Sequence, residues 1–325
     1  MTSRQRFRET MAFGTPDRVP YFEEGIRKDV LKSWYRQGLE RGTDLSDLFP
    51  ADRFDEIAPE LNPIPDFDVW PSSNQQLDLL KKRLTPDHRA RLPRKWSKMV
   101  RKWRQNDQLL FLRVHRGFFL SMGVHKWQRF TEVISLLLDD PDFVHKTMRI
   151  QGEFAAKIFE NILKEIEIDA VVFTEPIGGN EGPLISPKMY EEFVLKNYDQ
   201  VFEAIKSHGI ETIILRTYAN CRVLIPSMLK YGFNCLWACE TNIEAMDYRD
   251  IRKEFGRDLR LIGGIDLDVL RQDKENIRRE IEEKVPELIA DGGYVPLADG
   301  RVRKDISFEN YRYYRQLLEQ VTKIQ

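Results

Sequence analysis

The chain has 325 residues, of which 42% are hydrophobic and 32% are charged, and its formal net charge is -1. This composition is typical of a folded protein with a large core and a charged helical exterior, and it argues against a disordered chain. The small net charge provides no general attraction to nucleic acid or anionic lipid, so we expect neither nucleic acid nor a membrane among the partners.

The chain contains no uninterrupted apolar stretch of the ~20 residues that a membrane span needs, and its first residues lack the apolar core of a secretory signal. We therefore expect a cytoplasmic protein. The three cysteines, Cys221, Cys235 and Cys239, indicate reduced thiols rather than a disulfide framework. Cys235 and Cys239 would supply two zinc ligands if a turn brought them together, but the pattern around them favours a strand with buried structural cysteines.

The first half of the chain shows few regular elements. Val19 to Phe22 follows a turn and is consistent with a first strand, and Leu109 to Val114 is a clearer strand that ends at His115. Between them lies the proline-marked loop Asn62-Pro-Ile-Pro65. The pattern near Phe54 to Ile57 indicates a strand only weakly.

Basic residues crowd together from Lys81 to Arg104, with Trp96 and Trp103 among them. Phosphate neutralisation and base stacking by such a segment are typical of nucleic-acid binding, and the same charges could dock an acidic protein. The two tryptophans are seven positions apart, which places both on one face of a helix. We favour a solvated basic helix whose tryptophans pack inward.

From about residue 165 short apolar runs alternate with longer amphipathic segments, which predicts a parallel sheet with helical crossovers. The predicted strands are Asp169 to Glu175, Thr212 to Leu215, Phe233 to Cys239, Arg260 to Ile265 and a last strand after Gly292. The predicted helices are Met189 to Ile205, Leu224 to Lys230, Asp247 to Phe255, Lys274 to Ile289 and Phe308 to Val321.

Two runs near the carboxyl terminus, Leu261 to Asp266 and Gly292 to Asp299, each contain glycine or proline and end on a carboxylate. A buried parallel strand presents a side chain at its carboxyl end in this way, so the two runs indicate the last strands of a barrel enzyme. Barrels of this length usually form one unit. We therefore predict an α/β fold in which residues 1–325 make a single barrel domain.

Polar side chains follow the predicted strands, at the end where a barrel carries its reactive groups. Any one of them could be a loop salt bridge or a helix cap, but the set predicts a ring of carboxylates around one or two cations. The expected catalytic residues are Glu175, Glu240 and Asp299, and the expected substrate-binding residues are Glu24, His115, Arg216, Tyr218, Asn220 and Asp266. Glu23 and Arg116 are further candidates, and no metal ligand is assigned.

The chemistry of such a ring follows from its charges. Crowded carboxylates have raised pKa values, so one of them can stay protonated and act as a general acid. Arg216 is expected to anchor a substrate carboxylate or to orient a ring member. His115 either shuttles a proton or satisfies a backbone carbonyl.

The chain resembles the uroporphyrinogen decarboxylase superfamily, which also contains cobamide-dependent methyltransferases. The most specific match is Glu175 to Phe193, and it is joined by Thr15 to Pro20, Leu261 to Asp266, Gly292 to Pro296 and Phe308 to Tyr311. The resemblance implies a single TIM (β/α)8 barrel.

Two branches of the superfamily fit poorly. True decarboxylases carry an arginine-rich segment after the first strand that receives the acidic tetrapyrrole, whereas this chain has Tyr21-Phe-Glu-Glu-Gly25 there. Coenzyme-M methyltransferases hold zinc with a His-x-Cys pair and a further Cys. The aligned places here are Arg216, Tyr218 and about Gly300, which are not zinc ligands. A different metal site built from Glu175 and Glu240 stays open.

The chain looks most like a third branch, with Glu at the fourth and sixth strand ends, Gly-Gly-Ile-Asp at the seventh and Asp at the eighth. Members resembling this pattern are methyltransferases of anaerobic demethylase systems. The resemblance implies that a methyl group passes from an O-methyl donor, such as an aromatic methyl ether, to the cobalt of a corrinoid on a partner protein. Glu175 or Glu240 would protonate the leaving oxygen.

The chain departs from this branch at two places. Arg216-Thr-Tyr-Ala-Asn220 replaces an acidic segment, and Asp299-Gly300 replaces an Asp-His pair. Two alternatives therefore stay open, a cofactor-independent decarboxylase of a small carboxylic acid and a non-catalytic ligand-binding or scaffold barrel. The sequence does not decide between a monomer and a homodimer.

Overall fold

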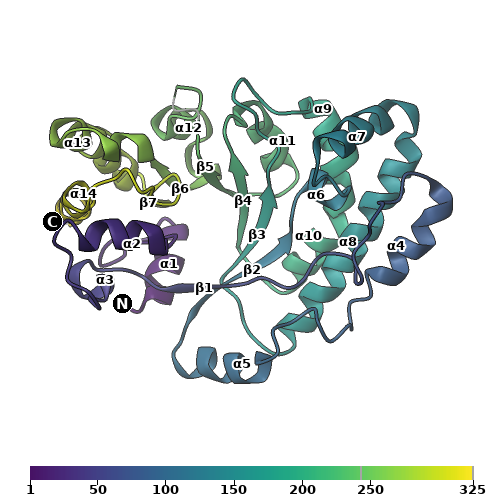
Figure 1. The fold of residues 1–325 in the computed structure, drawn as a ribbon, viewed down its shortest axis with the longest axis horizontal. Coiled ribbons are helices and arrows are strands. Elements are labelled where there is room, and N and C mark those ends of the chain that lie inside the picture. The colour runs from purple at the N-terminus through teal and green to yellow at the C-terminus, as the bar shows by residue number, and fades with distance from the viewer. Residues whose placement is uncertain (242–243, 324–325) are drawn as a thin grey trace. The chain divides into compact units, whose positions relative to one another are not determined.

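The computed structural model describes residues 1–241 and 244–323. The chain divides into two compact units. Unit 1 comprises Met1–Phe54 and Cys235–Gln325, and unit 2 comprises Asp55–Asn234. Strands and helices alternate in both units (Figure 1).

Unit 2 is built on a parallel sheet. Strand β3 (Ala170–Glu175) pairs in parallel with β2 (Leu109–His115) and with β4 (Thr212–Tyr218). β1 (Phe54–Ile57) is the neighbour of β2. Strands β2, β3 and β4 are nearly continuous apolar runs, as expected for a parallel sheet that is covered on both faces.

The helices of unit 2 lie between these strands or follow β4. They are η1 (Asn74–Gln76), α4 (Leu77–Arg83), α5 (Trp96–Gln105), α6 (Phe118–Ser121), α7 (Trp127–Asp139), α8 (Pro141–Leu163), α9 (Pro187–Met189), η2 (Tyr190–Val194), η3 (Leu195–Tyr198), α10 (Asp199–Ser207), η4 (Arg222–Leu224) and α11 (Ile225–Lys230).

A register shift near the end of β2 re-aims one side chain. Arg113 pairs with Val172, but His115, two residues later, pairs with the next residue, Phe173. The extra residue, Val114, makes a β-bulge. As a result His115 lies on the same face of the sheet as Phe173, and the two rings are 6.3 Å apart.

The segment after β3 differs from the single amphipathic helix that the sequence predicts. It consists of the short helix α9, the π-helical turn η2, the 3-10 turn η3 and the α-helix α10. The Asn197 side chain donates to the carbonyl of Phe193 at 2.8 Å. Such a local side-chain bond competes with a regular helical pattern. The apolar face is retained, because Phe202 of α10 stacks on Phe173 of β3 at 5.3 Å.

Unit 1 contains the remaining strands. β6 (Arg260–Ile265) pairs in parallel with β5 (Cys235–Cys239) and with β7 (Tyr294–Ala298). The helices are α1 (Ser3–Met11), α2 (Lys28–Tyr35), α3 (Leu45–Leu48), α12 (Tyr248–Phe255), η5 (Gly256–Asp258), η6 (Leu267–Arg271), α13 (Lys274–Ala290) and α14 (Phe308–Val321). The α/β class and the strands predicted after residue 165 are confirmed.

The predicted first strand is wrong. Val19 to Phe22 is not a strand, because the Tyr21 N–H donates to the Asp52 side chain at 2.9 Å and the Tyr21 carbonyl accepts from the Asp52 N–H. Both backbone groups are thus used outside any ladder. The weak pattern at Phe54 to Ile57 does form β1. Residues 1–241 and 244–323 therefore contain seven strands where the sequence predicts eight.

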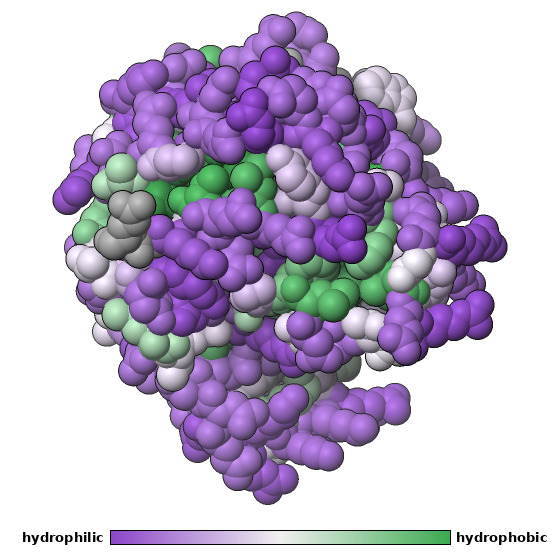
Figure 2. Space-filling view, turned by 90° about the vertical axis from the view of Figure 1, so that its left-hand side faces the viewer, coloured by the Kyte–Doolittle hydropathy of each residue, from purple (hydrophilic) through white to green (hydrophobic). Residues whose placement is uncertain are grey.

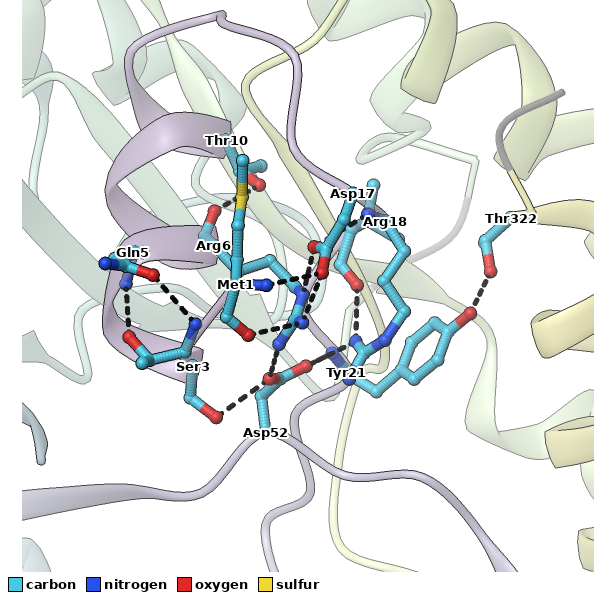
Figure 3. A network of polar contacts seen from close by, with 12 residues as sticks. Met1, Ser3, Gln5, Arg6, Thr10, Asp17, Arg18, Tyr21, Asp52 and Thr322 are labelled. Atoms are coloured by element: carbon cyan, nitrogen blue, oxygen red, sulfur yellow. Dashed lines mark hydrogen bonds and ion pairs between the residues drawn. The ribbon is translucent and has the colours of Figure 1, made fainter. Parts of the chain in front are cut away.

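Asp52 is the centre of a buried polar network in unit 1 (Figure 3). Its carboxylate accepts from Arg6 and Arg18, each at 2.5 Å, and from the Ser3 hydroxyl at 2.9 Å. Burial opposes its charge, but the hydrogen bonds from Arg18 and Tyr21 hold the pKa of Asp52 below its usual value. The network therefore joins helix α1 to two loops.

The basic segment adopts the packed arrangement that the sequence favours. Trp96 and Trp103 of α5 are buried, and their ring centroids are 5.6 Å apart. The Trp96 indole N–H donates to Glu165 at 2.8 Å, and the Trp103 indole N–H donates to Asp55 at 2.6 Å. Because both rings are buried and both N–H groups are satisfied, neither is available to stack on a base.

The protein surface in Figure 2 is largely hydrophilic, with scattered apolar areas. Across residues 1–241 and 244–323, no helix is both long enough and apolar enough to cross a bilayer.

Candidate active site

Glu175 ends β3, and its carboxyl has a raised pKa. Its side chain is buried, with 1% of the residue exposed. Oε1 accepts from the Phe118 N–H at 2.8 Å, and Oε2 accepts from the Tyr198 hydroxyl at 3.1 Å. Burial outweighs these two bonds and raises the pKa of Glu175 to about 7. A carboxyl with this pKa is available as a proton donor near neutral pH.

His115 lies beside this carboxyl and is held neutral. Its Nδ1 accepts from the Gly117 N–H at 2.9 Å and lies 3.0 Å from the Tyr198 hydroxyl. Burial, helped by the charge of Arg116, lowers the pKa of His115 to about 3. His115 therefore acts as a hydrogen-bond acceptor at neutral pH rather than as a cation.

The turn that covers Glu175 requires glycine at position 117. The backbone φ there is +97°, a left-handed conformation that side chains disfavour. A Cβ atom would also lie 2.8 Å from the carbonyl of Thr174 and 2.9 Å from Oε1 of Glu175. The turn can thus approach the carboxyl closely only because the residue is glycine.

Arg216 lies on the opposite face of the sheet from Glu175. It is level with Thr174 of β3, whereas Glu175 is level with Thr217, and successive side chains of a strand alternate between faces. Arg216 forms an ion pair with Glu56 of β1 at 2.8 Å. Arg113 binds the other oxygen of Glu56 at 2.5 Å. Two guanidinium groups thus flank one carboxylate.

The backbone at Tyr218 and Asn220, at and after the end of β4, packs closely against the backbone at Gly178 and Gly179, after β3. A Cβ at Gly178 would lie 1.9 Å from the carbonyl of Tyr218, and the Asn220 N–H donates to the carbonyl of Gly179 at 3.0 Å. The Asn220 side chain accepts from the Arg222 N–H. These contacts shape the loop after β4.

Asp299 follows β7 in unit 1, and its carboxylate accepts three hydrogen bonds. Oδ2 accepts from the N–H and the hydroxyl of Thr241 at 2.8 and 2.7 Å, and Oδ1 accepts from the Leu267 N–H at 3.1 Å. These bonds join the loops that follow β5, β6 and β7. They hold the carboxylate in place between these loops.

Glu240 and Asp266 belong to the same group of loops. The Glu240 N–H donates to the carbonyl of Asp299, and Glu240 has a left-handed φ of 46° although it is not glycine. Asp266 caps η6 by accepting from the Asp268 N–H at 2.7 Å. Burial, with a smaller effect from Asp299, raises the pKa of Asp266. Unit 1 thus brings three of the predicted acidic residues together.

Glu23 and Glu24 lie at a small cavity of about 10 Å³ near the end of β7. This volume holds at most one water. Glu23 forms an ion pair with Arg315 of α14, although burial raises the pKa of this carboxyl. Glu24 Oε1 lies 3.9 Å from the Cys239 sulfur. The segment after the predicted first strand thus presents carboxylates, and the nearby Arg315 is already paired.

Comparison with known proteins places the chain in a family. A family model for uroporphyrinogen decarboxylase matches residues 121–310, which is more than half of the chain. The chain belongs to the uroporphyrinogen decarboxylase family. The match includes Glu175, Arg216, Glu240 and Asp299 but not His115. A search of curated proteins found no match.

Among solved structures, the chain is similar to a Listeria monocytogenes protein named as a vitamin-B12 independent methionine synthase. The identity is 10%, the TM-score is 0.39, and the alignment covers 94% of this chain and 97% of that one. A likeness this weak carries no argument about function.

Three polar residues of this family member were not among the residues predicted from sequence. Tyr198 falls in a segment that is apolar at helical spacing, so it reads as a core residue. Glu56 lies on the weakly indicated strand. Arg113 did carry a signal, because it is the one charged residue within the apolar run of β2. Within residues 1–241 and 244–323, no group of three or more His, Cys, Asp or Glu residues could hold a metal ion.

Proposed function

We propose that the chain is a single-domain barrel enzyme that transfers a methyl group from a small O-methyl donor to the corrinoid of a partner protein. The observation that supports this function best is the Glu175 carboxyl, with its pKa of about 7 at the carboxyl end of β3. Catalytic groups of barrel enzymes lie at this end of the strands. Membership of the uroporphyrinogen decarboxylase family is compatible with methyltransferase chemistry.

In this reaction the bond between the methyl carbon and its oxygen breaks, and the oxygen keeps the electron pair. Glu175 gives that oxygen a proton, because an unprotonated phenolate or alkoxide is a poor leaving group. The reduced corrinoid of the partner protein would accept the methyl group and would supply the electron pair for the new bond to carbon. Glu175 then recovers a proton from water. Since Glu175 is 1% exposed, the Gly117 turn must move when the substrate binds.

Arg113 and Arg216 are the proposed anchor for a carboxylate of the substrate. They share Glu56, so two guanidinium groups lie close to one another. Arginine pairs well with carboxylates in such sites. Because Arg216 and Glu175 lie on opposite faces of the sheet, the substrate must reach the acid over the carboxyl end of β3.

Substitution of the two candidate acids tests the proposal. With an aryl methyl ether and reduced cobalamin as substrates, Glu175→Gln should lower methylcobalamin formation by about 100-fold, since general acid catalysis contributes that order of magnitude. Glu240→Gln is the matched control, a glutamate that is exposed. A loss in Glu240→Gln alone would move the acid to unit 1. Unchanged rates in both variants would remove the proposed acid.

The two neighbouring guanidinium groups of Arg113 and Arg216 also favour a second candidate, a decarboxylase of a small carboxylic acid that needs no cofactor. Here Arg216 would hold the carboxylate, and a neutral acid would protonate the carbanion after carbon dioxide leaves. Release of carbon dioxide without any corrinoid, lost in Arg216→Gln, would support this reaction. Methylcobalamin formation without such release would exclude it.

A further inference from the structure

We infer that Tyr198 and His115 form a hydrogen-bond switch that sets the protonation state of Glu175. They are positioning residues, because neither is proposed to touch the substrate. The use of the switch in catalysis rests on the proposed function, in which Glu175 is the acid, whereas the switch itself follows from the contacts alone.

The neighbours of His115 determine which of its ring nitrogens carries the proton. Nδ1 accepts from the Gly117 N–H at 2.9 Å, so the ring proton of the neutral imidazole is on Nε2. Nε2 lies 3.4 Å from the Ser121 hydroxyl, which can accept that proton's hydrogen bond. His115 can therefore act toward Tyr198 as a hydrogen-bond acceptor, through the Nδ1 lone pair that also accepts from the Gly117 N–H.

The Tyr198 hydroxyl has one hydrogen and two acceptors within reach. These are Oε2 of Glu175 at 3.1 Å and Nδ1 of His115 at 3.0 Å. When Glu175 is charged, Tyr198 donates to the carboxylate. When Glu175 is neutral, its own proton on Oε2 points to the Tyr198 oxygen, and the Tyr198 hydrogen turns to His115. Glu175 thus gains one proton, the Tyr198 hydroxyl reorients, and Tyr198 and His115 both stay neutral.

Tyr190 of η2 also interacts with Glu175, but through charge rather than through a hydrogen bond. Tyr190 is fully buried, like Tyr198. Among the residues that the structure describes, its hydroxyl has no hydrogen-bond partner. Burial and then the charge of Glu175 raise the pKa of Tyr190. Arg116 acts on His115 through its charge. Tyr190 is therefore a matched control, a tyrosine of the same segment that is not part of the switch.

The switch predicts opposite effects of its two members. Tyr198→Phe removes a donor to the carboxylate, so the neutral form of Glu175 is favoured and its titration midpoint rises. His115→Leu removes the acceptor that serves the neutral form, so Tyr198 donates to the carboxylate and the midpoint falls. We expect each midpoint to move by about one on the pH scale, since hydrogen bonds to charged groups are of that strength.

Infrared titration measures the midpoint without any assay of activity. The carbonyl band of the neutral Glu175 carboxyl is identified by its loss in Glu175→Gln and is followed against pH. His115→Asn keeps an acceptor near the position of Nδ1 and should return the midpoint to the wild-type value. Tyr190→Phe should leave the midpoint near that of the wild type.

Midpoints that move in the same direction in Tyr198→Phe and His115→Leu, or that do not move, would overturn the switch. If His115→Leu does not fold, as judged by near-ultraviolet circular dichroism, His115→Met provides the same loss of acceptor with a longer side chain. Opposite shifts together with unchanged methyl transfer in Glu175→Gln would retain the switch and reject the proposed function. Midpoints that move in the same direction, together with loss of methyl transfer in Glu175→Gln, would reject the switch and retain the proposed function.

Discussion

At the scale of single residues, Glu175 and His115 are two buried groups that are both neutral near pH 6. The pKa of Glu175 is raised from 4.5 to about 7, and that of His115 is lowered from 6.5 to about 3, chiefly by burial in both cases. In the folded protein Glu175 keeps a proton that the unfolded chain loses, and His115 stays without a proton that the unfolded chain accepts. Their effects on stability therefore oppose one another.

The sign follows from proton counts. Between pH 4.5 and about 7 the folded protein holds one proton more at Glu175 than the unfolded chain does, so this group makes the free energy of unfolding fall as pH rises. Below pH 6.5 the unfolded chain holds one proton more at His115, so this group makes the free energy of unfolding fall as pH decreases. From pH 4.5 to 6.5 the two slopes nearly cancel.

Glu175→Gln should separate the two effects, because glutamine does not titrate. Relative to the wild type, the variant should gain roughly 3 kcal/mol in free energy of unfolding between pH 4.5 and pH 8, since a tenfold change in proton affinity corresponds to about 1.4 kcal/mol. Urea unfolding of both proteins at the two pH values measures this change. An equal difference at both values would mean that Glu175 titrates normally.

The residue scale also shows what the sequence can and cannot reveal. Glu175 was predicted because it ends an apolar run, which places it at the carboxyl end of a strand. The link between His115 and Glu175 through Tyr198 was not predictable, because the placement of His115 depends on the bulge at Val114, which has no sequence signal. Tyr198 was missed because a buried tyrosine at helical spacing looks like a core residue.

At the scale of elements, the regular strands were predictable and the irregular turns were not. β3 to β7 are apolar runs bounded by polar residues or glycine, and the sequence predicts all of them. The proposed first strand failed because a side chain, that of Asp52, takes the place of a neighbouring strand. The helix after β3 was predicted as continuous because its apolar spacing survives the change to a π-helical turn.

The turn between β2 and α6 gives an element-scale prediction. Gly117→Ala should destabilise unit 2 by about 3 kcal/mol, because it adds backbone strain to a clash in which Cβ lies under 3.0 Å from Pro176 and Glu175. Gly209→Ala is the control, since Gly209 has a positive φ of 67° but open space around it. Chemical denaturation of the two variants should show a loss of only about 1 kcal/mol for Gly209→Ala. Equal losses would show that the Cβ contacts at position 117 add no cost beyond the backbone strain.

At the scale of the whole molecule, Asp52 anchors the amino-terminal segment. Asp52→Asn should cost about 3–5 kcal/mol, because it leaves the buried Arg6 beside a neutral partner. Asp17→Asn should cost less, since the Asp17 side chain is 42% exposed. The pKa of Asp52 is lowered, so its contribution is present at neutral pH and is lost as pH falls below 3.8. Chemical denaturation at pH 7 should show the larger loss of stability in Asp52→Asn, and at pH 3 this loss should be smaller. A loss of stability in Asp52→Asn that is the same at both pH values would contradict the predicted role of the Asp52 charge.

The Asp52→Asn variant also tests whether the two units unfold together as one cooperative domain. Domain boundaries normally fall in flexible linkers. Here one boundary lies between Phe54 and Asp55, inside β1, and the other lies directly before β5. We therefore predict a single unfolding transition.

Hydrogen exchange under native conditions measures whether the two units share one transition. Asp52→Asn, in unit 1, should lower the protection of the slowest amides of β3 in unit 2 as much as that of the slowest amides of β6 in unit 1, because globally exchanging amides share one free energy of unfolding. The Gly209→Ala variant of unit 2 should likewise lower both. Loss of protection confined to the unit that carries the substitution would divide the chain into two domains and end the single-domain prediction.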